Sequence, residues 1–393
     1  MKIKNLRTFR LKNKLVLYRP AYDVPLRRQG GKFTVHDDTR IQATLPTLQY
    51  LLKQNCRIVI LTWCGRPDGK RVVKYRLDPV AKRLGQLLKR PVKKLDDCVG
   101  PKVQKAVKVM KPKDIVMLEN VRFHPEEETK DKRFIKALSS LGEIWVFDAF
   151  AQAHRDVASI VGPPRFLPAV SGFLVEKEIM TLQRMMESPR RPFVAIIGGA
   201  KIEDKLMLLK ILLRQADYVL LGGVSANTIL QVKGIQVGKS KVEPKMVKAI
   251  RQLKITDLKL KIPVDVVTAK SLLPRARTQL KPVGRISQDD RILDIGPDTA
   301  RLYQSIIARA KTVLWSGPMG YFELPQFSRG TKDIAQAVAK TRGETIIGGG
   351  DTISAVEEAG VLNQIDFVST GGGAMLDYLA GEKLPGLKYL SKK

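Results

Sequence analysis

The sequence is poor in acidic residues: 38 Asp and Glu stand against 70 Lys and Arg in 393 residues, a formal net charge of +32. It also has no long apolar runs. The longest uncharged ones, such as residues 58–64, fall well short of the roughly 20 residues that cross a bilayer. This excludes a membrane-spanning protein. An apolar fraction of 44% is close to the globular average and excludes general disorder.

Cysteine and histidine are scarce as well. The three cysteines are widely spaced and form no CxxC pair, which predicts reduced, buried thiols instead of a zinc ribbon: Cys56, Cys64 and Cys98. The three histidines lack the spacing of metal ligands. The basic opening residues contain no apolar segment typical of a signal peptide, so we expect a cytoplasmic protein or one of an organelle matrix.

Short β-branched runs alternate with amphipathic, helix-like segments along the chain. This pattern is typical of an α/β protein with parallel sheets and crossover helices. The expected strands are residues 14–18, 57–63, 114–118, 144–147, 193–197, 218–221, 262–267, 312–315, 345–347 and 367–369. We predict two Rossmann-like parallel-sheet domains, 1–170 and 188–375, joined by a hinge helix, 171–187, and followed by a tail, 376–393.

Three loops that follow expected strands are rich in glycine or lysine. Behind a Gly-Gly turn, Lys201 and Lys205 are spaced i and i+4 on the first turns of a helix, where cations and free backbone amides favour phosphate. Two glycine triplets, residues 348–350 and 371–373, each follow a strand and open a helix. Asp351, after the first triplet, is a candidate ligand for a Mg²⁺ ion that bridges phosphates. A single triplet equally fits a tight turn, but the three loops together predict a nucleotide site.

The first half of the chain has arginines near its expected strand ends. Arginine binds carboxylate and phosphate through two parallel hydrogen bonds, so a cluster of arginines suits an anionic substrate. Each one alone is equally well explained as a surface charge, because the chain has 70 basic residues. The candidates are Arg19, Arg40, Arg66, Arg122 and Arg155.

Many short motifs occur in the order in which one enzyme family has them. They include DDTRI, GRPDGK, LENVRFHPEEE, DAFAQAHR, RPFVAIIGGAKIEDK, VLWSGPMGYFE, GGGDT and VSTGGGAM. The chain resembles phosphoglycerate kinase along essentially its whole length. The resemblance implies a two-lobed α/β fold that binds phosphoglycerate on a basic patch of the first lobe and ATP or ADP with Mg²⁺ on the second. Hinge closure would then bring the two together for phosphoryl transfer.

The resemblance also implies roles for individual residues. Arg40 resembles the transition-state arginine, and Lys201 and Lys205 resemble the phosphate-binding lysines. The implied catalytic residues are Arg40, Lys205, Gly350 and Gly373. The implied substrate-binding residues are Arg19, Asp23, Arg40, Arg66, Arg122 and Arg155. The implied nucleotide-binding residues are Lys201, Lys205, Gly223, Ser316, Glu323, Gly349, Gly350, Asp351 and Thr352, with Asp351 as metal ligand.

Three positions depart from the family pattern where phosphoglycerate would bind. The aspartate that accepts the substrate hydroxyl is Ala21 here, the asparagine of the same motif is Asp23, and the histidine of the next motif is Trp63. Each lost polar contact costs about 1 to 3 kcal/mol, and the charge of Asp23 adds repulsion toward an anion. The three changes together predict weakened substrate binding.

Two hypotheses follow. The first is a phosphoglycerate-kinase fold with a degraded 3-phosphoglycerate site, impaired in catalysis and repurposed as a basic RNA- or ribosome-associated structural protein that still binds nucleotide. The second is an active, monomeric phosphoglycerate kinase of glycolysis, which transfers phosphate between 1,3-bisphosphoglycerate and ADP. The lost contacts and the positive charge, densest between Lys82 and Lys113, favour the first. A deliberately altered enzyme is also compatible with the sequence.

Overall fold

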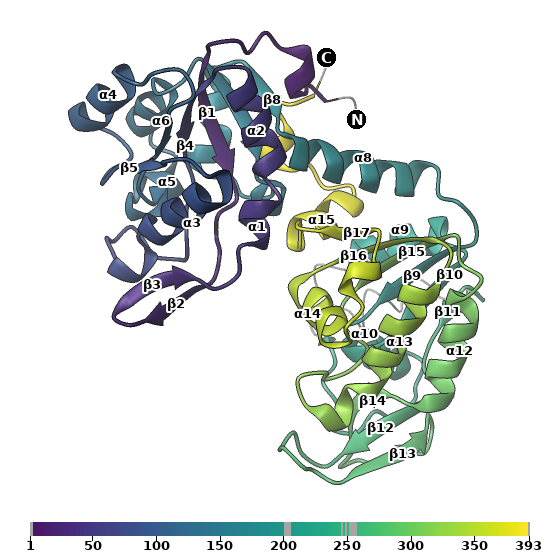
Figure 1. Ribbon diagram of the computed structural model, residues 1–393. Helices are drawn as coiled ribbons and strands as arrows, with labels where there is room; N and C mark the ends of the chain where they lie inside the picture. Colours follow the sequence, from purple (N-terminus) through teal and green to yellow (C-terminus); the bar gives the residue numbers. More distant parts are fainter. Residues whose placement is uncertain (1–2, 200–205, 245–246, 248–249, 251–257, 392–393) are drawn as a thin grey trace. The chain divides into compact units, whose positions relative to one another are not determined.

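The computed structural model describes residues 3–199, 206–244, 247, 250 and 258–391. The chain folds as two units, Met1–Thr181 with Lys383–Lys393, and Leu182–Glu382 (Figure 1). Residues 383–393, expected as part of a tail, belong to the first unit, where Gly386 N donates to Ala153 O (2.9 Å). Both units combine a parallel sheet with helices, so the predicted α/β fold class is confirmed.

The first unit is built on a six-stranded parallel sheet in the order β5-β6-β4-β1-β7-β8. Strand β1 (Leu15–Pro20) lies inside this sheet and is buried from Val16 onward, as its apolar run predicts. The other strands are β4 (Arg57–Ile60), β5 (Lys93–Lys94), β6 (Ile115–Met117), β7 (Ile144–Asp148) and β8 (Ala169–Ser171). An antiparallel hairpin, β2 (Leu26–Gln29) and β3 (Lys32–Val35), lies outside the sheet, where we expected no strand.

Helices cover both faces of this sheet. Apolar residues of α2 and α3 form one core cluster with alternate strand residues such as Val16 and Ile58. Right-handed crossovers place α4 and α6 on the opposite face. The helices of the first unit are α1 (Thr39–Gln42), α2 (Leu45–Lys53), α3 (Asp78–Leu88), α4 (Pro101–Lys108), α5 (Glu126–Thr129), α6 (Lys132–Ser139) and α7 (Ala158–Val161).

Helix α8 (Phe173–Glu187) runs from the first unit into the second. The sequence predicted a helix over residues 171–187, and the structure begins it at Phe173 because residues 169–171 form β8. Arg7, near the start of the chain, lies against its first turn, with the guanidinium carbon 4.4 Å from the Phe173 ring.

The second unit has its own six-stranded parallel sheet, in the order β11-β10-β9-β15-β16-β17. Its strands are β9 (Phe193–Ile197), β10 (Tyr218–Leu221), β11 (Leu260–Lys261), β15 (Thr312–Ser316), β16 (Glu344–Gly348) and β17 (Phe367–Ser369). The segment 262–267, predicted as a strand of a parallel sheet, instead contributes to an antiparallel sheet. That sheet consists of β12 (Asp265–Ala269) between β13 (Thr278–Pro282) and β14 (Arg291–Ile295).

Helices of the second unit bury apolar residues against its parallel sheet. Tyr303 and Ile307 of α12, and Ile334 and Val338 of α13, form a core cluster with strand residues such as Val313. The helices are α9 (Leu206–Gln215), α10 (Gly223–Val232), α12 (Pro297–Ile307), α13 (Arg329–Lys340), α14 (Gly350–Glu358) and α15 (Gly373–Leu379).

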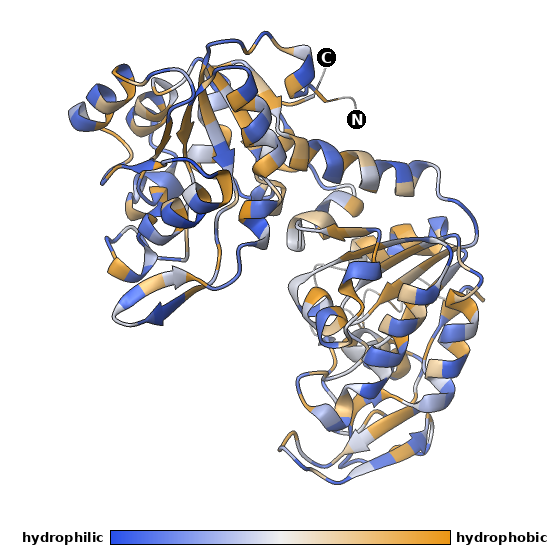
Figure 2. Ribbon diagram, viewed as in Figure 1, coloured by the Kyte–Doolittle hydropathy of each residue, from blue (hydrophilic) through white to orange (hydrophobic). Residues whose placement is uncertain are grey.

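Hydropathy follows this layering. Figure 2 shows apolar strands in both sheets and helices that alternate apolar and polar faces. Within the described residues, no helix combines the length and the apolar character that a membrane crossing requires. All three cysteines are free and buried, as predicted, and burial raises the pKa of Cys56 and Cys64 to about 11.

Candidate functional site

Four of the five predicted arginines of the first unit follow parallel strands in the chain, and Arg19 is the second-last residue of β1. Strands β1, β4, β6 and β7 end at Pro20, Ile60, Met117 and Asp148. Parallel strands present their carboxyl ends at one edge of the sheet, and ligands of open α/β sheets bind at this edge. Because Arg19 lies at the end of β1 and the other four arginines lie in segments that follow these strands, the topology directs them to this edge. We call this edge, with Asp23, Trp63, Gly65 and the arginines, the arginine edge.

Arg122 is fixed at the arginine edge by neighbouring loops. Its Nη1 donates to Gly65 O (3.0 Å), and its backbone N donates to the side chain of Asn120 (3.1 Å). The Asn120 amide also donates to Cys64 O (2.6 Å), which joins the loops after β4 and β6. Asn120 was not among the predicted site residues, although it stands two positions before Arg122 in the ENVRF motif.

Asp23 completes this arrangement. Its Oδ1 accepts a hydrogen bond from Gly65 N (2.8 Å), and its carbonyl oxygen accepts one from Arg40 Nη1 (2.6 Å). The backbone N and O of Gly65 therefore link Asp23 to Arg122, and Asp23 links Gly65 to Arg40. Three predicted site residues thus belong to one connected group.

Trp63 contacts two of the predicted arginines. The guanidinium carbons of Arg19 and Arg122 each lie 4.2 Å from its ring. Arg19 is fully buried, and burial lowers its pKa to about 9. Its Nε donates to Ser159 Oγ (3.1 Å) and its Nη1 to Pro20 O (2.5 Å). Arg19, expected to bind substrate, therefore contacts protein groups from inside the unit and does not reach the surface.

A buried acid lies near Arg19 and shares Ser159 with it as a hydrogen-bond partner. Glu127 is fully buried, and its two oxygens accept hydrogen bonds from Ser159 Oγ (2.6 Å) and Ser159 N (2.8 Å). Burial raises the pKa of Glu127, while the Ser159 bonds and the charge of Arg19 act in the opposite direction. Sequence reasoning missed both residues, because an acid and a serine 32 positions apart form no local pattern.

The remaining arginines are accessible. Arg40 is half-buried, and Arg66 and Arg155 are exposed. Three guanidinium groups at one edge therefore remain open to a small anion, with Arg122 partly open beside them at a side-chain exposure of 12%. Hydrogen bonds connect Arg40 and Arg122 through Asp23 and Gly65, and Arg19 lies buried against Trp63.

The glycine-rich loops of the second unit lie at the carboxyl edge of its parallel sheet. Gly198 N donates to Ser316 O (2.9 Å), and Gly223 N donates to Met319 O (2.7 Å). A Cβ atom at Gly198 would lie 2.1 Å from Pro318 O, so only glycine fits there. The loops after β9, β10 and β15 are thus packed backbone against backbone, which leaves little room for side chains.

The loop between β16 and α14 is more open. Gly349 has a φ of +99°, and a Cβ atom at Gly350 would meet nothing within 4 Å. A ligand can therefore approach the backbone amides at the start of α14 closely, as anions do at helix N-termini. Thr352 is buried, and its hydroxyl accepts from Gly317 N (2.7 Å) and donates to Gly348 O (3.1 Å). It fixes this loop to the one after β15.

Asp351 lies exposed on the first turn of α14. The described part of the chain contains no group of three or more His, Cys, Asp or Glu side chains able to hold a metal ion on their own. Mg²⁺ is usually held by one or two carboxylates together with substrate phosphates. A single exposed carboxylate beside an open glycine loop fits that kind of site.

The other predicted residues of the second unit that the structure describes lie at the ends of parallel strands or in the segments after them. Ser316 is buried at the end of β15, and Gly223 opens α10 with a φ of +55°. Glu323 is exposed in the segment after β15, and Gly373 begins α15 with open space around it. Two further predicted residues lie outside the described residues: Lys201 and Lys205.

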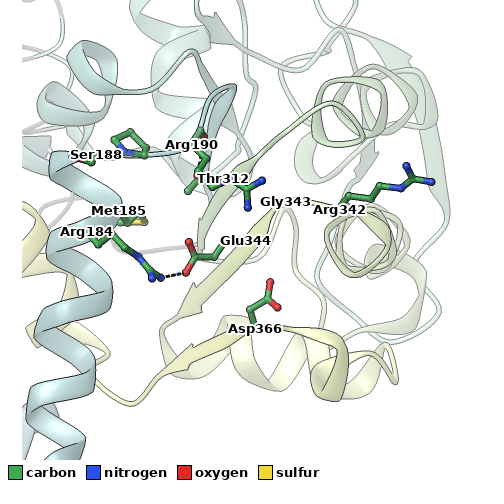
Figure 3. Close-up of a pocket in the computed structure, with 10 residues that line it drawn as sticks. Arg184, Met185, Ser188, Arg190, Thr312, Arg342, Gly343, Glu344 and Asp366 are labelled. Carbon is green, nitrogen blue, oxygen red and sulfur yellow. Dashed lines mark hydrogen bonds and ion pairs between the residues drawn. The ribbon is translucent and has the colours of Figure 1, made fainter.

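A surface pocket of about 400 Å³ lies at the other edge of this sheet (Figure 3). Thr312 and Glu344, which line it, are the first residues of β15 and β16. Arg184 forms an ion pair with Glu344, and Asp366 accepts hydrogen bonds from Thr345. Its acids are thus engaged in the fold, and it lies away from the edge where ligands of such sheets bind.

The fold and the two edges define a class of protein: a two-unit α/β protein with arginines at the carboxyl edge of one sheet and open glycine loops at the carboxyl edge of the other. The family model of phosphoglycerate kinase matches residues 6–382. The phosphoglycerate kinases of Moorella thermoacetica and Aquifex aeolicus are each 45% identical to this chain, covering 99% of it and 99% and 98% of their own lengths.

Solved structures agree. That of phosphoglycerate kinase from Coxiella burnetii matches with a TM-score of 0.87 and 36% identity, over 99% of both chains. That of the enzyme from Pyrococcus horikoshii matches with a TM-score of 0.83 and 33% identity, over 99% of this chain and 98% of that one. The chain belongs to the phosphoglycerate kinase family.

Proposed function

We propose that this protein is an active phosphoglycerate kinase that transfers a phosphoryl group between 1,3-bisphosphoglycerate and ADP in glycolysis. The observation that carries the proposal is the connected group of Arg40, Asp23, Gly65 and Arg122 at the arginine edge. Because guanidinium groups bind carboxylate and phosphate with matching geometry, this edge suits a small acid that carries both.

The chemistry requires positioning and charge neutralisation. The acceptor in the direction of ATP consumption is a carboxylate, which needs no base to deprotonate it. Arg66, Arg122 and Arg155 would hold the anionic substrate. Arg40, whose guanidinium donates to the Asp23 carbonyl oxygen, would neutralise charge that develops on the transferred group.

The second unit would bind ADP or ATP. The open backbone at Gly350 and the glycines of the loop after β17 suit phosphate groups. Asp351 would hold Mg²⁺, which when bound supplies positive charge to the phosphates. Thr352 keeps the loops around this site in register through Gly317 N.

The alternative of a degraded site repurposed for RNA has less support. The relatives that match the whole chain are named phosphoglycerate kinase, and none of these names mentions RNA or a ribosome. Of the three residues that depart from the family pattern, Asp23 and Trp63 make specific contacts within the arginine edge. Binding to structured RNA, a monomeric state and a cytoplasmic location stay predictions.

A coupled assay with 3-phosphoglycerate, ATP and Mg²⁺ tests the proposal. We expect a kcat on the order of 1 to 100 s⁻¹. Arg122→Ala should raise the KM for 3-phosphoglycerate about tenfold or more, since it removes a charged contact. The matched control is Arg57→Ala, because Arg57 opens β4 at the opposite edge of the same sheet and should leave the KM unchanged. Absence of turnover in the unaltered protein, with nucleotide binding intact, would contradict the proposal.

A further inference from the structure

Trp63 has a role at the arginine edge that its size alone does not explain. It is 2% exposed and lies at the carboxyl edge of the sheet, three residues after the end of β4. Both guanidinium carbons nearest to it, those of Arg19 and Arg122, lie 4.2 Å from its ring. At this distance the negative face of an indole attracts a cation, and the attraction grows when water is excluded.

Each of the two guanidinium groups has the Trp63 ring as a neighbour. Among the described groups, Arg19 Nη2 and Arg122 Nε are buried and have no hydrogen-bond partner. A buried charged group with an unpaired N–H is destabilised unless another interaction compensates. The Trp63 ring contacts both cations and contributes to that compensation, beside the charges of Glu127 and Asp23, which act on both.

Arg122 also has a competing partner. Its Nε lies 3.6 Å from Oε1 of Glu128, whose side chain is 62% exposed. The ring and the Gly65 carbonyl hold the guanidinium at the arginine edge, whereas the Glu128 carboxylate draws it toward solvent. A side chain without a π face at position 63 would leave the Gly65 bond and this ion pair to decide where Arg122 points.

We propose that Trp63 is a positioning residue, whose ring holds the Arg122 guanidinium at the arginine edge for an anionic three-carbon phosphate, with Arg19 as its buried support. The inference rests on the proposed function for the identity of the substrate. Trp63 thus organises the anion site through cation–π contacts, whereas a histidine at this position would donate a hydrogen bond from a ring N–H. Substitution of this residue therefore changes substrate affinity more than it changes turnover.

The test compares Trp63→Phe with Trp63→Leu, since both are apolar and smaller than Trp but only Phe retains an aromatic face. The Kd of 3-phosphoglycerate is measured by calorimetry, and KM and kcat by coupled assay. Trp63→Leu should weaken binding and raise KM about tenfold, with kcat changed by less than about twofold. Trp63→Phe should stay within about threefold of the unaltered protein. Trp63→Met replaces the leucine variant if that one does not fold.

The matched control is Trp145→Leu. Trp145 is fully buried on β7 of the same sheet and stacks on Phe147 with centroids 5.0 Å apart. The Trp145→Leu substitution should lower the melting temperature and leave the Kd and KM for 3-phosphoglycerate unchanged. Equal losses of affinity in Trp63→Phe and Trp63→Leu, or none in either, would overturn the proposal. Since the calorimetric Kd needs no turnover, an inactive protein would refute the proposed function and still report on Trp63.

Discussion

Asp23 is the acidic residue of the arginine edge, and its side chain accepts a hydrogen bond from the backbone of Gly65 through Oδ1. Burial lowers the pKa of Arg122 and of Arg19, and the nearby charge of Asp23 acts against that shift. An anionic substrate would meet Arg122 with part of its charge already balanced. Asp23 therefore both orders the edge and weakens its attraction for anions.

Replacing Asp23 with asparagine separates these two effects. Asp23→Asn keeps an oxygen that can accept from Gly65 N and removes the negative charge. We expect a KM for 3-phosphoglycerate lower by about three- to tenfold, because a like charge near an anion is unfavourable. Asp114→Asn is the control, since Asp114 precedes β6 at the other edge of the sheet. A higher KM in Asp23→Asn would show that the carboxylate itself contributes to binding.

Thr352 is a second residue whose side chain makes a specific contact, in this case through its hydroxyl group. Thr352→Val preserves shape but leaves Gly317 N without its acceptor, at a cost of about 1 to 3 kcal/mol in unfolding free energy. The Kd for ADP should rise as the two loops lose their link. Urea unfolding and calorimetry measure the two effects. Thr352→Ser keeps the hydroxyl and should behave like the unaltered protein; equal losses in both variants would contradict the role given to this hydroxyl.

Sequence motifs located most of the candidate site but not its internal contacts. The arginines were found because they stand in motifs of the family, most of them close to an expected strand end. The burial of Arg19, the stacking on Trp63 and the Glu127–Ser159 pair were not found. They depend on residues far apart in the chain that only the strand order brings together. The loss of a histidine at position 63 was visible, whereas the contacts that Trp63 makes were not.

At the scale of elements, the start of α8 is held by a buried carboxylate. Asp148 ends β7, and its Oδ1 accepts from Leu174 N (3.0 Å) and Val175 N (3.2 Å), while Phe173 N donates to Thr47 Oγ1 (2.9 Å). Tyr18 also donates to Asp148 at 2.8 Å. The first amides of the helix that runs between the units are therefore satisfied by residues of the first sheet and of α2.

This anchor should respond to pH. Burial raises the pKa of Asp148 to about 6, partly offset by its hydrogen bonds. Between about pH 4 and pH 6 the folded state then binds more protons at this group than the unfolded state, so its contribution to stability is present at low pH and is lost as pH rises. We expect the unfolding free energy of the unaltered protein, relative to Asp148→Asn, to fall by about 2 to 3 kcal/mol from pH 4 to pH 7. Urea unfolding at both pH values measures this, and a pH-independent difference would contradict it.

The elements were predicted unevenly from the sequence. Buried parallel strands are short apolar runs with clear flanking loops, so most of both large sheets was predictable. The segment 262–267 has the same apolar pattern, which says nothing about strand direction, and the structure makes β12 antiparallel. The hairpin of β2 and β3 is largely exposed, and β5 is Lys93–Lys94, so neither has an apolar pattern to recognise.

At the scale of the whole molecule, the dominant feature is the charge of +32. Within the stretch between Lys82 and Lys113, where the positive charge is densest, Lys102, Lys105 and Lys108 lie exposed on α4. Charges of one sign at this density repel one another and destabilise the folded state. This repulsion is a property of the sequence that salt can screen.

We therefore expect sodium chloride to stabilise the protein. Raising the ionic strength from about 10 mM to about 150 mM shortens the Debye length from about 30 Å to about 8 Å. The melting temperature should rise by a few degrees over this range. Calorimetric scans at matched pH measure it, with sucrose at equal osmolarity as the control for solvent exclusion. A melting temperature that falls with added chloride would mean that attractive ion pairs dominate.

The return of residues 383–393 to the first unit has a consequence for biosynthesis. Lys4 N donates to Leu390 O (2.8 Å), and Ile3 pairs with Ser391, so the earliest and latest parts of the described chain lie together. On a translating ribosome, the unit begun first is completed only when these last residues emerge from the exit tunnel. The first unit, although it is begun first, therefore cannot complete its contacts until after the last residue of the second unit, Glu382, has been synthesised.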